Sequence, residues 1–214
     1  MSKLSKRHFW EWFKRNNKEY LDLNNKTKKE ATYWLNELNA HLRAYYKFFE
    51  YRISLPDKGI PNLTITVSGK AMHFKKVDLF VATAPEIAGW QISALEDPMP
   101  IEFLLEKHME STGIHPAEFS FSFASEDPED TNVIIYHPLC TPQNEGPYLQ
   151  LAYAAVYNLV GERAFGLDIG QLEMSNLSTA DPDDVYPLEE LLIHISLRKP
   201  AMVVGPNGTL EGLI

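Results

Sequence analysis

The sequence predicts an α/β protein of the α+β type, in which an N-terminal helical hairpin precedes two β-β-α-β halves with a mainly antiparallel sheet. Two patterns carry this prediction. Apolar side chains recur at helical spacing near both ends of the chain, and paired stretches of alternating apolar and polar residues lie between them. We expect a single domain over 1–214, divided into a hairpin (1–47), a first half (48–99), a crossover (100–117), a second half (118–176), a C-terminal helix (181–199) and a tail (200–214).

The hairpin is predicted from its aromatic residues and from one capping signal. Phe9, Phe13 and Tyr20 fall on one stripe of a helix that covers about 4–22. Thr27 and Glu30 then have the spacing of a capping box, which starts a second helix. Such an aromatic surface could stack on nucleic-acid bases, but large aromatic residues at helical spacing more often pack into a core. We therefore expect these rings to be mostly buried.

The two halves are predicted from strands of alternating pattern around one apolar helix each. In the first half, strands at 48–54, 63–69 and 89–96 accompany a helix over 70–84 that Pro85 ends. In the second half, strands at 118–124, 133–138 and 167–174 accompany a helix over 147–160. The segment 100–112 reads as a crossover helix, and Pro187 suits the first turn of the last helix. No convincing residue-by-residue repeat relates the halves.

The stretch GERAFGLDIGQLE (161–173) resembles a phosphate-binding loop because three glycines surround Arg163. A phosphate loop, however, leads from a strand through glycines into the N-terminus of a helix. Here the order is reversed, since we expect the helix to end near Val160, Gly161 to cap it, and the chain to leave through Gly166 into a strand. The sequence therefore predicts a corner rather than a nucleotide site.

Charge is divided unevenly along the chain, whose formal net charge is −9. Residues 1–58 contain 13 basic and 7 acidic residues, whereas residues 59–214 contain 7 basic and 22 acidic residues. Such a contrast suits a basic arm for nucleic acid, an acidic face for a basic partner, or internal complementarity. Cys140 is the single cysteine, which excludes an intrachain disulfide, and no apolar run approaches the roughly 20 residues of a membrane span. We expect a cytoplasmic protein.

No motif for catalysis or metal binding stands out. Zinc sites use tight ligand pairs, and His108, His115, His137 and Cys140 supply only one, so we predict neither a metal nor a cofactor. The acidic turns at 126–130 and 181–184 lack the ligand spacing of a calcium loop. The weak catalytic candidates are those that the fold could bring together as a hydrolase-like site, namely Asp127, Asp130, His137 and Cys140.

Several segments resemble a family of bacterial cytoplasmic α/β proteins. They are the FWxWF opening at 9–13, the AP-x3-GW segment at 84–90 and the PLxEL segment near the C-terminus, together with LTITVSGK (63–70) and YNLVGE (157–162). The resemblance covers most of the chain, and it implies a small α/β protein that stands alone. It brings no activity and no catalytic residue to this sequence.

Three functions follow as hypotheses. The leading one is a non-catalytic binding or regulatory protein, in which Glu102, Glu106 and Glu110 line one helix face that meets a basic protein partner. The alternative is the hydrolase-like enzyme. Nucleic-acid binding by the basic hairpin is the weakest, because the acidic remainder would repel a polyanion; its phosphate contacts would be Lys14, Arg15, Lys18, Lys26, Lys28 and Lys29. We expect no membrane partner, and the sequence leaves a homo-oligomer open.

Overall fold

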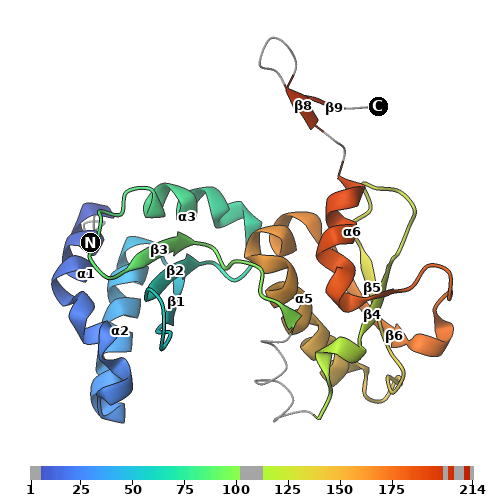
Figure 1. Ribbon diagram of the computed structural model, residues 1–214, viewed down its shortest axis with the longest axis horizontal. Helices are drawn as coiled ribbons and strands as arrows, with labels where there is room; N and C mark the ends of the chain where they lie inside the picture. Colours follow the sequence, from blue (N-terminus) through green and yellow to red (C-terminus); the bar gives the residue numbers. More distant parts are fainter. Residues whose placement is uncertain (1–5, 102–112, 200–201, 205–209, 213–214) are drawn as a thin grey trace. The chain divides into compact units, whose positions relative to one another are not determined.

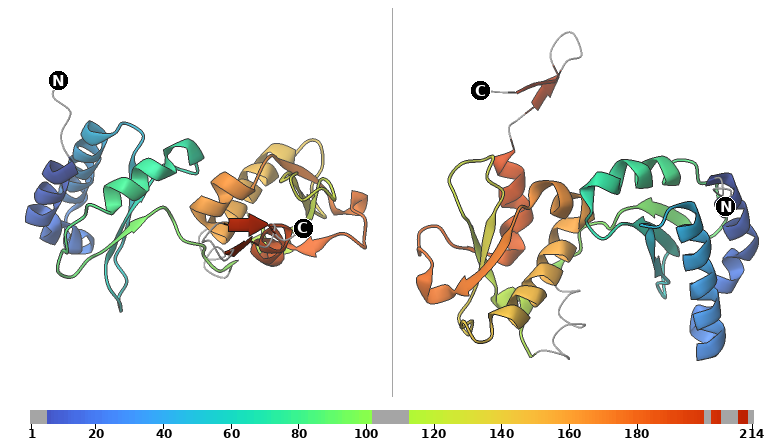
Figure 2. Two further views of the ribbon diagram at one scale, coloured as in Figure 1. Left: turned by 90° about the horizontal axis from the view of Figure 1, so that it is seen from above. Right: turned by 180° about the vertical axis from the view of Figure 1, so that it is seen from behind.

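The structure, a computed structural model, describes residues 6–101, 113–199, 202–204 and 210–212 (Figures 1 and 2). The chain divides into two compact units, unit 1 over Met1–Glu96 and unit 2 over Asp97–Ile214. Residues 59–96 contain 3 basic and 3 acidic residues, so the division of charge is the same at this boundary as at residue 58. Unit 1 contains 16 basic and 10 acidic residues, and unit 2 contains 4 basic and 19 acidic residues. The two units therefore carry opposite net charges, +6 and −15.

Unit 1 begins with the predicted hairpin of helices α1 (Lys6–Leu21) and α2 (Lys28–Tyr45). The capping box is confirmed, because the Thr27 side chain accepts from the Glu30 N–H and the Glu30 carboxylate accepts from the Thr27 N–H. The expected burial of the aromatic rings is also confirmed for most of them. The rings that are almost completely buried are those of Phe9, Trp10, Phe13 and Tyr20.

The first sheet has the order β1-β2-β3, from β1 (Glu50–Ser54), β2 (Asn62–Thr66) and β3 (Gln91–Ala94). β1 and β2 are antiparallel, whereas β2 and β3 are parallel and are joined through helix α3 (Phe74–Val81). The hairpin packs onto this crossover helix, where the Trp10 indole N–H donates to the Phe80 carbonyl at 3.2 Å. The predicted β-β-α-β order of the first half is confirmed.

Unit 2 repeats this topology with a longer helix. β4 (Ser120–Phe123) and β5 (Val133–His137) are antiparallel, helix α5 (Glu145–Asp168) follows, and β6 (Leu172–Asn176) pairs parallel to β5. A short fourth strand, β7 (Tyr186–Pro187), pairs antiparallel to β4 and makes the sheet order β6-β5-β4-β7. Each sheet is thus mixed and contains one parallel pair. The second β-β-α-β half is confirmed as well.

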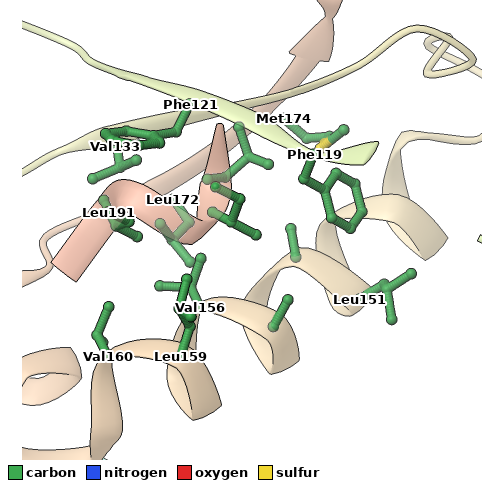
Figure 3. Close-up of a cluster of buried hydrophobic side chains, with 14 of the residues drawn as sticks. Phe119, Phe121, Val133, Leu151, Val156, Leu159, Val160, Leu172, Met174 and Leu191 are labelled. Carbon is green, nitrogen blue, oxygen red and sulfur yellow. The ribbon is translucent and has the colours of Figure 1, made fainter. Parts of the chain in front are cut away.

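Helices α5 and α6 (Leu191–Arg198) cover one face of the second sheet. Figure 3 shows the side chains of this core between the sheet and the helices. The sheet contributes Phe121, Val133 and Leu172, while α5 contributes Val156 and Val160, all of them buried. Two layers around one apolar core are the architecture that an α+β sequence is expected to reach.

The prediction for Gly161 was only partly right. Gly161 has φ 77° and ψ 160°, so it leaves the helical conformation as expected for a glycine in this position. The chain then returns to a helix that continues to Asp168, and the kink lies inside α5 instead of ending it. The sequence could not show the reason for this kink, which is a tertiary contact: a Cβ at Gly161 would lie 2.7 Å from the Pro98 ring. A close approach of two backbone segments, not a phosphate, requires this glycine.

The C-terminal helix begins later than the predicted 181. Residues 181–185 form a turn, Tyr186–Pro187 form the edge strand β7, and a 3-10 turn at Leu188–Glu190 leads into α6. Pro187 therefore stands in an edge strand, where the lack of an N–H is tolerated, rather than in a first helical turn. The buried side chains of this segment are those of Leu188, Leu191 and Ile195. In the tail, β8 (Met202–Val204) pairs with β9 (Leu210–Gly212).

The fold class is confirmed as α+β, with N-terminal helices, two mixed sheets and a C-terminal helix. The predicted crossover helix over 100–112 falls almost entirely on 102–112, which lie outside the described residues. Among the helices that the structure describes, none is long and apolar enough to cross a membrane.

Replacing Gly161 by alanine should destabilise unit 2 strongly. The new Cβ would meet Pro98 at 2.7 Å, and the backbone conformation at this position suits only glycine. We expect a loss of about 3 kcal/mol or more in the free energy of unfolding, measured by urea denaturation. Gly146→Ala is the matched control, because that glycine has no heavy atom within 4 Å of its Cβ position. Equal stability of the two variants would contradict the proposed role of Gly161.

Candidate functional site

The carboxyl end of the parallel pair β5–β6 gathers polar side chains in unit 2. In mixed and parallel sheets this end is where ligands most often bind, because successive strands stop there and loops diverge. β5 ends at His137 and β6 ends at Asn176, which lie opposite each other in the ladder. Glu118 precedes β4 and reaches the same end, and Asn144 stands before the first turn of α5. We call these residues and Cys140 the strand-end cluster.

Hydrogen bonds at both ring nitrogens hold His137 in one tautomer. The ring is 1% exposed, and its Nδ1 accepts from the Leu139 N–H at 3.1 Å. Its Nε2 therefore carries the proton and donates to the Glu118 carboxylate at 3.1 Å. Phe119 and Tyr148 pack against the ring, with centroids at 5.3 and 4.8 Å. This arrangement orients a histidine beside a carboxylate, but it buries the imidazole under apolar neighbours.

Cys140 follows in the same turn and is also buried. Burial, aided by the negative charge of Glu145, raises the pKa of the Cys140 thiol. The thiol is 3% exposed in the apolar core of unit 2. Because the thiolate is the reactive form, this environment is typical of a structural cysteine and not of a nucleophile.

Asn176 ties the two strand ends together. Its amide donates to the carbonyls of Pro138 (3.0 Å) and Cys140 (2.7 Å). Its side-chain oxygen accepts from the Ser178 N–H and hydroxyl group. The amide group thus satisfies carbonyls that would otherwise lie unpaired where both strands stop. The sequence analysis missed this residue, although its position at a predicted strand end was a usable signal.

The opposite end of the sheet carries a turn with a high density of carboxylates, residues 125–130, which we call the acidic turn. Arg198, at the end of α6, donates from a single nitrogen, Nη2, to three backbone carbonyls of this turn. The acceptors are the carbonyls of Ser125 at 2.9 Å, Asp130 at 3.2 Å and Asp127. The guanidinium also lies over the Phe123 ring, 4.0 Å from its centroid. One cation therefore organises the backbone of the whole turn.

The carbonyl contacts leave the acidic side chains on the outside. Glu126, Asp127 and Glu129 are exposed, and Asp130 is half-buried. The carboxylates of Asp127 and Asp130 each accept a backbone N–H two residues ahead, from Glu129 and Asn132. Beside the turn lies a small pocket of about 90 Å³, lined by Phe123, Pro128, Thr131, Asp168, Ile195, Arg198 and Lys199.

The four catalytic candidates are divided between these two ends. His137 and Cys140 belong to the strand-end cluster, while Asp127 and Asp130 lie in the acidic turn at the other end of β5. The length of β5, five residues at about 3.3 Å each, separates the two pairs. Within the part of the chain that the structure describes, no three His, Cys, Asp or Glu side chains are arranged to hold a metal ion.

The predicted interaction residues Glu102, Glu106 and Glu110 lie outside the described residues. The second acidic turn, at 181–184, is described, and Asp181 and Asp183 are exposed there. The sequence analysis missed Arg198. Its position as one of four basic residues in a strongly acidic unit was a signal that it contacts acidic segments.

Comparisons with known proteins give no further assignment. No family model matches the chain, and neither the curated proteins nor the solved structures contain a match.

The Cys140 thiol should react slowly in the folded protein. Because burial raises its pKa, the thiolate fraction near pH 8 should be far below that of an unfolded cysteine, whose pKa is about 8.5. We expect a thiol-specific reagent to label the native protein at least tenfold more slowly than the protein in denaturant. Fast labelling of the native protein at neutral pH would instead indicate an activated nucleophile and would support the hydrolase-like alternative.

Asn176→Asp should destabilise unit 2, because a carboxylate would replace the amide that donates to two carbonyls. We expect a loss of about 2 kcal/mol at pH 7. The loss should shrink at low pH, where the protonated acid regains one donor and no longer repels the carbonyls. Gln143→Glu, the same chemical change at an exposed position of unit 2, is the control for urea denaturation. A similar small effect for both variants would show that Asn176 does not hold the strand ends.

Proposed function

We propose that the protein is a non-catalytic binding protein that presents the acidic surface of unit 2 to a basic protein partner. The observation that supports this proposal most is that the whole acidic excess of the chain lies within unit 2. Unit 2 concentrates 19 acidic residues against 4 basic ones in one compact unit. Charge of one sign on one unit attracts an oppositely charged partner and raises the rate of encounter.

The acidic turn supports the proposal because its conformation is fixed from inside. Exposed carboxylates on a loose loop lose conformational entropy when a partner orders them. Here Arg198 holds three carbonyls of the turn, so Glu126, Asp127 and Glu129 project from a backbone that is already ordered. A preordered acidic loop binds with a smaller entropic cost than a mobile one.

The state of the candidate catalytic groups favours binding over hydrolysis. The Cys140 thiol is buried with a raised pKa, and the His137 ring is buried with both nitrogens engaged. The carboxylates of Asp127 and Asp130 cap backbone N–H groups of their own turn. Each of these groups has a structural partner that accounts for its position.

The proposal is tested by the binding of a labelled octa-lysine peptide as a stand-in for a basic partner. We expect wild-type protein to bind at low ionic strength and to weaken by more than tenfold between about 20 and 200 mM salt. The triple change Glu102→Lys, Glu106→Lys, Glu110→Lys and the double change Glu126→Lys, Glu129→Lys should each weaken binding several-fold. Fluorescence anisotropy measures the affinity in each case.

The matched control reverses two exposed acids of unit 1. Asp57→Lys with Glu86→Lys alters the net charge by the same amount as the double variant of the acidic turn. This control should retain most of the affinity if unit 2 is the binding surface. Equal losses in the control and the acidic-turn variant would mean that only total charge matters, and unchanged affinity in all variants would remove the acidic surface as an interaction site.

A further inference from the structure

Strand β1 in unit 1 is an edge strand with one free side. Within the described residues, the sheet order β1-β2-β3 leaves β1 paired only with β2. An unpaired strand edge offers a row of backbone donors and acceptors to any extended chain that reaches it. Proteins cover such edges or use them for strand addition. The residues beside β1 therefore decide whether this edge is covered or is open for strand addition.

The direction of the free backbone groups follows from the hydrogen bonds of β2. The Gln91 N–H donates to the Pro61 carbonyl and the Leu95 N–H donates to the Ile65 carbonyl, so alternate residues of β2 face β3. Thr64 therefore faces β1 and bonds with Arg52, which lies opposite. The next residues along β1, on either side of Arg52, point their N–H and C=O groups away from β2. These residues are Tyr51 and Ile53.

The free groups of Tyr51 and Ile53 have no other partner among the described residues. Backbone hydrogen bonds outside the ladders involve neither residue in this part of the chain. The side chains of the same two residues turn towards α2, where the Tyr51 hydroxyl donates to the Leu35 carbonyl at 2.8 Å. The edge is therefore open, although a helix stands beside it.

A groove runs between α2 and β1 along this edge. It consists of two adjoining hollows of about 460 and 330 Å³ that share Leu35 and Tyr51. Along α2 it extends from Ala31 to Arg43, which are 12 residues apart, or about 18 Å. A strand rises about 3.3 Å per residue, so this length accommodates five or six residues of an extended peptide.

The two halves of the groove differ in chemistry. The first is mainly apolar and is lined by Leu23, Asn24, Ala31, Leu35, Tyr51, Ile53 and Leu55. The second is polar and is lined by Leu35, Asn36, Asn39, Arg43, Glu50 and Tyr51. In the second half Glu50 is already engaged by Arg43 at 3.8 Å and by the Ser68 hydroxyl at 2.8 Å. The Arg43 guanidinium is 52% exposed despite this contact, so it can also meet an incoming acid, together with the amides of Asn36 and Asn39.

We propose that the α2–β1 groove binds an extended peptide as an added antiparallel strand, with apolar side chains in the Leu35 half and an acidic side chain at Arg43. The net charge of +6 on unit 1 is complementary to such a peptide. Antiparallel pairing is slightly more stable than parallel pairing. A second copy of the chain fits less well, because its own α2 lies along its β1 and would compete for the same space. This site is separate from the acidic surface of unit 2.

The test uses a fluorescein-labelled peptide, Val-Thr-Val-Thr-Glu-Thr, and two N-methylated forms of it. In an antiparallel pair, two residues that lie directly opposite each other have their side chains on the same face of the sheet. The peptide residues that bond with Tyr51 and Ile53 therefore also turn their side chains towards α2, and in this peptide they are the two valines. N-methylation of the two valines should therefore abolish binding, whereas N-methylation of the first two threonines should change the affinity less than threefold. Replacing Glu by Lys in the peptide should weaken binding about tenfold. Binding is followed by fluorescence anisotropy with the full chain.

Protein variants test the same groove from the other side. Arg43→Glu should weaken binding of the peptide about tenfold, whereas Lys75→Glu, an exposed residue of α3 with the same charge change, should have little effect. Ala31→Trp should block the apolar half. Equal affinity for both N-methylated peptides would overturn strand addition. Sedimentation tests the alternative occupant. If the wild-type protein is a dimer and Arg43→Glu dissociates it, the groove binds a second copy of the chain and the peptide proposal is overturned.

Discussion

Both units depend on a parallel strand pair, and a parallel pair can be joined only by a crossover that returns along the sheet. In each unit this crossover is a helix, α3 or α5, whose apolar residues cover one face of the sheet. The remaining helices then pack beside the crossover helix, as the contact of Trp10 with the Phe80 carbonyl and the burial of Leu191 show. One connection therefore decides which sheet face is the core and which elements remain at the edges.

The polar side chains discussed above gather where the strands end. Asn176 and Arg198 each use one side chain to satisfy several backbone carbonyls where strands end. Such contacts give loop carbonyls a side-chain donor, and an unpaired carbonyl away from water would be costly. The resulting loops present exposed acids on the outside and keep His137 and Cys140 inside. This division is one basis of the proposal that the protein recognises its partner with a preordered surface.

Opposite charges on two compact units give the chain two different kinds of surface. In the proposed function, the acidic unit attracts a basic partner over a distance, an effect that salt screens. The basic unit offers a groove in which backbone hydrogen bonds and apolar contacts act at short range, with one guanidinium to select an acid. The two proposals thus rest on separate residues and respond differently to ionic strength.

The sequence by itself determined the local elements, because periodicity and caps act over a few residues. The strand around Phe121, the aromatic stripe of Phe9 and Phe13, and the Thr27–Glu30 capping box all appear as predicted. Only the tertiary structure decided features that depend on a distant partner. The Pro98 ring requires Gly161 to kink α5, and pairing with β4 turns Tyr186–Pro187 into a strand. Likewise, the contact of His137 with Glu118 depends on the pairing of β4 with β5, which no local pattern encodes. The separation of His137 from Asp127, by contrast, follows from the predicted strand itself.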